Sequence, residues 1–549
     1  MTYLKDLFST KKTPQSEPIP GAGHAPNSAG GYAWPVDDWT RLDRFLVLGS
    51  EGGSYYASER KLTLENAQAV IRCLQADGAR AVARIVEISE SGRAPKADPA
   101  IFALALATTE RASADARKAA LDALPRVCRT GTHLFHFAGY VDGLRGWGRG
   151  LRRAVTEWYG MPAEKLAYQA VKYQSRDGWS HRDLLRLSHA KVPADSAHQL
   201  VYEWIVKGWE SASEAPHPVP ELRLVWAFER AKRAETRAEV VRLIREHRLP
   251  REAVPTQWLT EAEVWEAVLE EMPMTALSRS LATMTRVGLI APNSAGTRRV
   301  VEQLGDGDRL LKARVHPIAV LAALKTYAQG HGERGKNTWT PGQPVVDALD
   351  AAFYASFGSV RRTGKRWLLA LDVSGSMDCG TVAGVPGLTP RVASAAMALI
   401  TAATEQAHTF VGFTAGRGGF GGQWGGGDPG VTEIPISPRK RLDSIVKQVA
   451  ALPMGGTDCA LPMLWAMKRK VEADVFVIYT DSETWAGAIH PAQALRQYRE
   501  RMGIPAKLVV VGMVSNGFSI ADPEDGGMLD VVGFDTAAPN LVSDFATAE

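Results

Sequence analysis

Three short stretches of this sequence place carboxylates and hydroxyls where a hard metal ion could be held. The stretch RWLLALDVSGSM is an apolar run that stops at Asp372, and Ser374 and Ser376 follow at two-residue spacing. GGTD supplies Thr457 from a glycine-flanked loop, and VFVIYTDSET places Asp481 after a second apolar run. Two carboxylates and three hydroxyls are oxygen ligands of the kind that Mg²⁺ accepts while keeping one or more positions open. The sequence therefore predicts a divalent-cation site, with Mg²⁺ as the expected ion, formed by Asp372, Ser374, Ser376, Thr457 and Asp481.

Each stretch also has an ordinary structural explanation. D-x-S-x-S arises by chance, and a Ser or Asp after a strand commonly caps the next helix. Three such stretches, each at a strand end or in the loop that follows, favour the metal site. Ser374 follows DV and lacks the G-x-S-x-G of a nucleophile elbow, and GGGDPG leads into strand-like VTEIPI where a dinucleotide site requires a helix. Because no general base or nucleophile is found, the sequence predicts a protein that is not an enzyme.

An α/β pattern from residue 363 onward would position these residues. The apolar strands RWLLALDV, TFVGFT, DVFVIYT and AKLVVVGM alternate with amphipathic helices such as TPRVASAAMALITAATEQA and PAQALRQYRERM. The alternation predicts a doubly wound, mainly parallel sheet with helices on both faces. Ligands bind such sheets at the carboxyl ends of the strands, which is where Asp372 and Asp481 stand.

The preceding residues have helical periodicity almost throughout. TLENAQAVIRCLQADG, for example, has apolar residues three and four apart, a Thr63 that can cap the helix, and a closing glycine. So long a succession of short helices favours stacked pairs, as in a solenoid, although no clean period proves a repeat. Residues rich in Pro, Gly and Ser precede the helices and predict a flexible arm. We divide the chain into an arm at 1–36, an all-α repeat region at 37–362 and an α/β domain at 363–549.

Positive charge is concentrated in the helical part. Residues 1–362 contain 49 Lys and Arg against 41 Asp and Glu, whereas 363–549 contain 15 against 19. From 142 to 191 the ratio is ten to five, and the cations alternate with Trp and Tyr. Cations hold phosphates and bases stack on flat rings, so this stretch suits RNA. It is equally compatible with a solvated helix face whose rings, Trp158 and Trp179, lie in the core.

No feature of the sequence indicates export. MTYLKDLFST lacks the apolar core of a signal peptide, and no stretch approaches the length of a membrane span. The four cysteines are scattered without disulfide or metal spacing. A cytoplasmic protein with reduced thiols and no membrane contact is expected.

Longer stretches resemble known families. The five predicted ligands match the metal-ion-dependent adhesion site of the von Willebrand factor A fold position by position. RFLVLGSEGGSYYASERKLTLENA, RDGWSHRDLLRLSH and KARVHPIAVLAALKTYAQGHGERGK are similar to the Ro autoantigen family, which joins a TROVE module to such a domain. The resemblance runs from about residue 38 to the C-terminus and indicates a bacterial homologue.

This resemblance implies a ring of HEAT-like helical repeats closed by the A-type domain. Such rings bind small noncoding Y RNA on an outer basic surface, admit single-stranded 3′ ends of misfolded RNA, and in bacteria are associated with an exoribonuclease such as polynucleotide phosphorylase. A ring within one chain implies a monomer that acts as a scaffold or chaperone. The family's RNA contacts carry over onto Lys172, Arg176 and His189, with Arg145, Arg149 and Arg152 as further candidates.

A second hypothesis stays open beside RNA binding. The A-type domain could be a protein-interaction module whose Mg²⁺ captures a carboxylate of a partner, without any RNA function. The glycine-rich segment 415–430, AGRGGFGGQWGGGDPG, departs from the family pattern and is expected to hang between strands without fixed structure. It leaves open whether the domain's partner surface matches that of the family.

Overall fold

The computed structural model describes residues 12–191, 195–210, 212–213, 215–332, 336–358, 360–385, 388–415, 430–436, 442–452 and 455–548, with the backbone only at 196, 442, 443, 446 and 450. Residues 1–11 of the predicted arm and most of the glycine-rich segment lie outside this set. The described residues form two parts, which we call the helical array (α2 to α20) and the sheet domain (β5 to α25).

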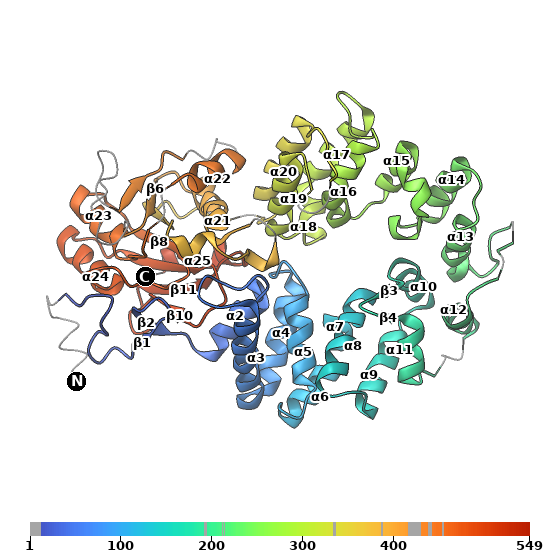
Figure 1. The fold of residues 1–549 in the computed structure, drawn as a ribbon, viewed down its shortest axis with the longest axis horizontal. Helices are drawn as coiled ribbons and strands as arrows, with labels where there is room; N and C mark the ends of the chain where they lie inside the picture. Colours follow the sequence, from blue (N-terminus) through green and yellow to red (C-terminus); the bar gives the residue numbers. More distant parts are fainter. Residues whose placement is uncertain are drawn as a thin grey trace.

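The helical array confirms the all-α prediction for the first part. Its helices are α2 (Asp38–Leu48), α3 (Glu59–Ala76), α4 (Gly78–Ser91), α5 (Asp98–Ala107), α6 (Ala114–Asp122), α7 (Leu124–Val127), α8 (Gly131–Leu144), α9 (Arg149–Tyr159), α10 (Ala163–Lys172), α11 (His181–Ser188), α12 (Ser196–Lys207), α13 (Arg223–Ala231), α14 (Arg237–His247), α15 (Ala262–Glu270), α16 (Met274–Arg286), α17 (Ala295–Gly305), α18 (Gly307–Lys312), α19 (Pro317–Gln329) and α20 (Gln343–Ala355). Short 3-10 turns η1 (Pro220–Leu222), η2 (Arg251–Ala253) and η3 (Thr256–Thr260) and a small hairpin of β3 (Ser175–Arg176) and β4 (Trp179–Ser180) connect them. In Figure 1 the helices follow one another in a curved row that leads away from the sheet domain and back to it.

Helices that are near in sequence pack against each other, as in a solenoid. α2 packs on α3, α5 on α8, and α19 on α20. A single apolar core runs through the array and includes the large side chains Trp226 and Trp265, which are fully buried. Because each short helix buries its apolar face mainly on its neighbours, the array gains its stability from stacking and not from helix propensity.

A six-stranded sheet of the described residues forms the centre of the second part. Its order is β11-β9-β8-β5-β6-β7, and all neighbours are parallel except β6 and β7. The strands are β5 (Trp367–Asp372), β6 (His408–Phe413), β7 (Val431–Glu433), β8 (Val475–Thr480), β9 (Lys507–Gly512) and β11 (Met528–Val532), and the helices are α21 (Pro390–Thr404), α22 (Leu442–Ala450), α23 (Leu461–Arg469), α24 (Pro491–Met502) and α25 (Ala538–Thr547). The predicted doubly wound α/β domain is confirmed.

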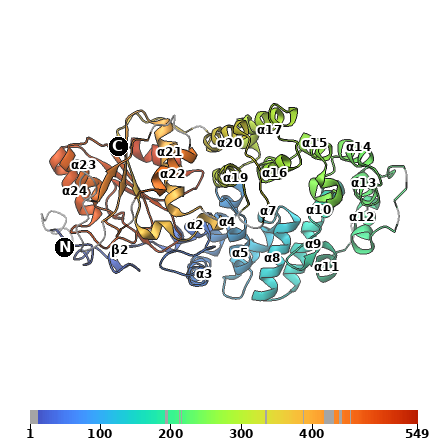
Figure 2. The same ribbon diagram turned by 45° about the horizontal axis from the view of Figure 1, so that its top comes forward.

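Alternate residues of the central strands enter two different cores. Leu369 and Val477 pack with α21 and α22, whereas Leu368 and Phe476 pack with α23 and α24. Figures 1 and 2 both show α21 and α22 on the side of the sheet nearer the helical array and α23 and α24 on the far side. Burial on both faces explains why these strands are continuously apolar in sequence.

The prediction of a flexible arm is wrong for residues 12–36. β2 (Tyr32–Pro35) pairs with β1 (Ala25–Pro26) and, on its other side, with β10 (Phe518–Ser519) of the sheet domain. The fully buried Gln15 donates from Nε2 to Asp458 Oδ1 at 2.7 Å and to the carbonyl of Ile489 at 2.8 Å. The segment is held by backbone pairing and by buried polar contacts. Because neither requires a regular spacing of apolar residues, the sequence carries no sign that this segment is ordered.

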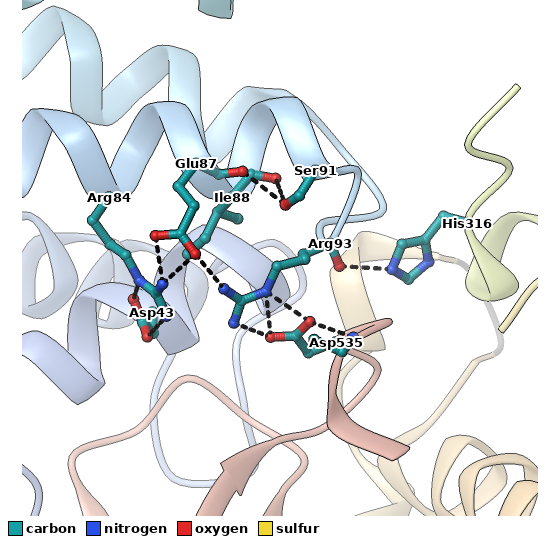
Figure 3. Close-up of polar contacts among 9 residues, drawn as sticks. Asp43, Arg84, Glu87, Ile88, Ser91, Arg93, His316 and Asp535 are labelled. Carbon is teal, nitrogen blue, oxygen red and sulfur yellow. Dashed lines mark hydrogen bonds and ion pairs between the residues drawn. The ribbon is translucent and has the colours of Figure 1, made fainter. Parts of the chain in front are cut away.

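The two ends of the helical array meet beside the sheet domain, as Figure 3 shows. The carbonyl of Arg93, in the loop after α4, accepts a hydrogen bond from Nε2 of His316, directly before α19, at 2.9 Å. The guanidinium of Arg93 pairs with Asp535 of the sheet domain, with 2.9 Å between Nε and Oδ1. One loop therefore joins the beginning of the array, its end and the sheet domain, and we call Arg93, His316 and Asp535 the closing junction.

Candidate functional site

The five predicted metal ligands lie at one edge of the sheet. Asp372 is the last residue of β5, and Asp481 directly follows β8, its parallel neighbour. Ser374 and Ser376 lie at the start of the 3-10 turn η4 (Gly375–Asp378), and Thr457 lies in the loop before α23. Because parallel strands end at the same edge, the topology brings the two carboxylates together although they are far apart in sequence.

Hydrogen bonds fix the loops that carry these residues. The Ser374 amide donates to Asp372 Oδ1 at 2.9 Å, and the hydroxyls of Ser374 and Ser376 are 3.1 Å apart. The amide of Gly375 donates to the carbonyl of Gly455 at 3.2 Å, which ties the Thr457 loop to the serine loop. All five predicted ligands are buried.

Burial makes the two carboxylates costly in the charged state. It raises the pKa of Asp372, although hydrogen bonds from Ser374 and Thr480 oppose the rise. It also raises the pKa of Asp481 to about 8, and repulsion from Asp372 and then Glu483 adds to the effect. Neither Asp372 nor Asp481 forms an ion pair within the part of the chain that the structure describes. Two buried, mutually repelling carboxylates among hydroxyls are a donor set that fits a divalent cation.

Three neighbours of this site were missed by the sequence analysis. Thr480 Oγ1 donates to Asp372 Oδ2 at 2.7 Å. Tyr56, from the loop after α2 in the helical array, lies beside Ser376; burial and then the charges of Asp481 and Glu483 raise its pKa. Glu483 accepts from the amide of Ser28 at 2.7 Å. This edge of the sheet is thus in contact with two segments of the N-terminal part. Of the three neighbours, only Thr480 carried a local signal in the sequence, since it ends a strand.

Lys172, Arg176 and His189 surround the β3–β4 hairpin and α11. Lys172 ends α10, the exposed Arg176 lies in β3, and His189 follows α11 in a left-handed conformation with φ of 50°. His189 is exposed, as a residue that contacts a ligand must be. α11 is about 12 Å long, because its eight residues rise about 1.5 Å each. Arg176 and His189 therefore stand at opposite ends of that helix, a spacing suited to an extended anion and not to a single small one.

Arg145, Arg149 and Arg152 lie on the neighbouring helices. Arg145 caps the C-terminus of α8, and α9, which carries the other two, packs beside α11. Trp147 and Trp179 contact each other with centroids 5.9 Å apart and connect this group to the hairpin. Both rings are half-buried, whereas Trp158 is 2% exposed and belongs to the core. We call Lys172, the four arginines and His189, together with the hairpin between them, the basic surface.

Arg182 and Arg186 extend the basic surface and were not singled out from sequence. They lie four residues apart on α11, so they share one face of the helix, and both are exposed. Neither has an ion-pair partner among the residues that the structure describes. Their four-residue spacing in HRDLLRLS would have allowed the sequence analysis to place them on one face of a helix.

Comparison with known proteins covers both parts of the chain. The TROVE domain matches residues 25–365, and the Ro60 vWA domain matches residues 366–546. The chain is 46% identical over 525 residues to the RNA-binding protein RO60 of Deinococcus radiodurans, covering 95% of each. It is 36% identical to the RNA-binding protein RO60 of Caenorhabditis elegans, covering 98% of this chain and 92% of that protein. The crystal structure of the Deinococcus radiodurans RO (RSR) protein superposes with a TM-score of 0.68 over 93% of this chain and 99% of that one. Within the described residues, no helix is both long and apolar enough to cross a membrane.

Proposed function

Since the chain belongs to the Ro60 family, in which a TROVE domain precedes a von Willebrand factor A domain, we propose that it is an RNA-binding protein that uses the basic surface of its helical array. The observation that carries this proposal is the exposure of Arg182 and Arg186 on α11, which have no ion-pair partner among the described residues, close to the half-buried rings of Trp147 and Trp179. The two relatives compared above, at 46% and 36% identity, are both RNA-binding proteins by name.

The finer proposal concerns which RNA is bound and to what end. The bound species are a small noncoding RNA of the Y type and misfolded RNA with a single-stranded 3′ end. The protein acts as a scaffold or chaperone in RNA quality control, as a cytoplasmic monomer, and presents the RNA to an exoribonuclease such as polynucleotide phosphorylase. The spread of cations over α8, α9, α10 and α11 supports an extended phosphate backbone as the ligand. The chain itself performs no catalytic step in this scheme.

A second function rests on the metal site. Asp372, Ser374, Ser376, Thr457 and Asp481 would hold Mg²⁺ there, and a bound Mg²⁺ would supply a Lewis-acidic position for a carboxylate of a partner protein. The buried, mutually repelling carboxylates of Asp372 and Asp481 support this proposal. The two functions are compatible, because the metal site lies in the sheet domain and the basic surface lies in the helical array.

Salt dependence tests the RNA function on the native protein. We expect tight binding to a hairpin with a single-stranded 3′ tail, and a logarithm of affinity that falls with the logarithm of salt by about 0.7 to 0.9 per phosphate contacted. Fluorescence anisotropy with a labelled hairpin measures this, and the same hairpin without its tail is the control. An affinity that stays flat from low to high salt would contradict phosphate-based binding and leave the metal-dependent interaction as the better account.

A further inference from the structure

The five predicted metal ligands are shielded from solvent in part by the helical array. None of them is more than 6% exposed. A cation that captures a carboxylate of a partner protein needs one coordination position that the partner can reach. Tyr56 of the helical array lies beside Ser376, one of the five ligands. The contacts that hold Tyr56 there therefore decide what can reach a cation at this site.

A tight turn between α2 and α3 carries Tyr56. The amide of Ser54 donates to the carbonyl of Ala57 at 2.8 Å, and the amide of Ala57 donates to the Ser54 hydroxyl at 3.1 Å. Tyr55 and Tyr56 form the tip of the turn, with their ring centroids 4.9 Å apart and their planes at 76°. Tyr55 is 59% exposed, whereas Tyr56 is half-buried. The turn thus directs one ring to solvent and the other to the sheet domain.

Backbone contacts seat the segment before this turn on the sheet domain. The hydroxyl of Ser515 donates to the carbonyl of Gly49 at 2.5 Å, and the hydroxyl of Thr381 donates to the carbonyl of Glu51 at 3.3 Å. Gly52, with φ of 80°, approaches Thr381 so closely that an added Cβ atom would lie 2.2 Å from Thr381 Oγ1. Because Thr381 follows η4, the segment rests on the loop that carries the two serine ligands.

The Tyr56 phenol stands among the carboxylates of the metal site. Burial raises the pKa of Tyr56 most, and the negative charges of Asp481, Glu483 and Asp372 raise it further. Because the effect of a charge falls with distance, the phenol is near the two carboxylates that are expected to hold the cation. A protonated phenol offers the same kind of neutral oxygen as the serine and threonine ligands. It can therefore face a cation without adding charge to the site.

We propose that the turn Ser54–Ala57 is a gate on the metal site, in which Tyr56 covers the position that a partner's carboxylate would take on the cation. The inference rests on the proposed metal-dependent interaction and adds a condition to it. With the gate closed, the cation ties the helical array to the sheet domain, and a partner binds only when the turn is displaced. Capture of a partner is thereby coupled to the contact between the two parts of the chain.

Mn²⁺ is the probe for the first test. It accepts the oxygen ligands that suit Mg²⁺ and is paramagnetic, so the relaxation of water protons reports water that exchanges at the bound ion. The native protein is compared with Tyr56→Ala and with the matched control Tyr55→Ala, which removes the neighbouring exposed ring. The electron paramagnetic resonance signal of free Mn²⁺ first measures how much ion each protein binds. Sodium acetate is then added as the carboxylate probe.

We expect all three proteins to bind Mn²⁺. In Tyr56→Ala the relaxivity of the bound ion should rise about twofold, because a further coordination position opens to water. Acetate should lower this relaxivity in Tyr56→Ala and leave it unchanged in the native protein and Tyr55→Ala. Equal relaxivity in the three loaded proteins, or displacement of water by acetate in the native protein, would overturn the gate while the metal site stands. If the native protein binds no Mn²⁺, the metal-dependent function fails instead.

A second measurement uses the native protein alone. Hydrogen exchange is followed by mass spectrometry with and without Mg²⁺. We expect Mg²⁺ to slow exchange both in the peptide that covers residues 50–58 and in the peptide that covers 372–378, because the cation and the turn hold each other in place. Slower exchange confined to the sheet domain would overturn the gate even if Tyr56→Ala fails to fold. Unchanged exchange in both peptides would count against the metal site itself.

Discussion

Replacing Arg93 with methionine is expected to lower the free energy of unfolding by about 3–5 kcal/mol. The side chain of Asp535 is 6% exposed and its carboxylate accepts from Arg93 Nε at 2.9 and 3.0 Å. Methionine keeps much of the buried stem but leaves the Asp535 charge without its counter-ion. The change should also loosen the contact between Arg93 and His316, and with it the closing junction. Urea unfolding followed by far-ultraviolet circular dichroism measures the effect.

Arg84→Met is the matched control for this prediction. Arg84 belongs to the same polar cluster (Figure 3) but pairs with Asp43 and Glu87, and its side chain is 28% exposed. We expect a loss of about 1 kcal/mol or less, because partly solvated ion pairs contribute little. Asp535→Asn combined with Arg93→Met should cost less than the sum of the single changes, since the pair is removed together. Equal losses for Arg93→Met and Arg84→Met would contradict the role of the closing junction.

Mg²⁺ is expected to stabilise the native protein, and Asp372→Ala is expected to abolish that stabilisation. At a concentration of a hundred times its Kd, a ligand that binds only the folded state adds about 2.7 kcal/mol. Alanine also removes the acceptor of the Ser374 amide and the Thr480 hydroxyl, so the effect of Mg²⁺ is measured within each protein and not between the two. A thermal melt with and without Mg²⁺ therefore separates loss of the metal from loss of the fold.

Asp458→Asn is the control for the metal prediction. Asp458 is a buried carboxyl next to Thr457, but its Oδ1 accepts from Gln15 and it is not among the predicted ligands. Its variant should keep the Mg²⁺-dependent rise in melting temperature. A rise that persists in Asp372→Ala, or is absent from the native protein, would show that the five residues do not hold a divalent cation.

The position of Asp372 and Asp481 at one edge of the sheet could be predicted from sequence, because both follow directly from the ends of strands. A parallel sheet forces the ends of β5 and β8 to one edge, so two separated motifs could be combined without any structure. Tyr56 could not be predicted in the same way. It comes from a loop of the helical array, and only the packing of that array beside the sheet domain brings it to Ser376.

Elements whose stability depends on distant partners were also missed. β11 contains Asp530, a residue type that is unfavourable in strands. The fully buried Arg44 of α2 forms an ion pair with it, with 2.7 Å between Nη2 and Oδ1. The helix that begins with Glu59 was expected to be capped by Thr63, but the Ser58 hydroxyl accepts from the Lys61 amide one turn earlier. Hydrophobic periodicity located the helix correctly. Its N-terminal boundary was misplaced because Ser58 and Thr63 can both cap a helix. The N-terminal segment lacked any period, because polar contacts such as that of Gln15 with Asp458 hold it.

The central claim, that the basic surface holds RNA, is tested most directly by an affinity measurement. The ligand is a hairpin with a single-stranded 3′ tail, and the native protein is compared with the triple variant Lys172→Met, Arg176→Gln, His189→Asn. Asparagine is chosen at 189 because it tolerates the positive φ there. The control variant, Lys61→Met, Arg298→Gln, Lys312→Met, removes three exposed side-chain cations from α3, α17 and α18. We predict that the first variant loses at least tenfold in affinity, about 1.4 kcal/mol, while the control stays within twofold of the native protein. Equal affinities for all three proteins would show that the basic surface does not hold the RNA.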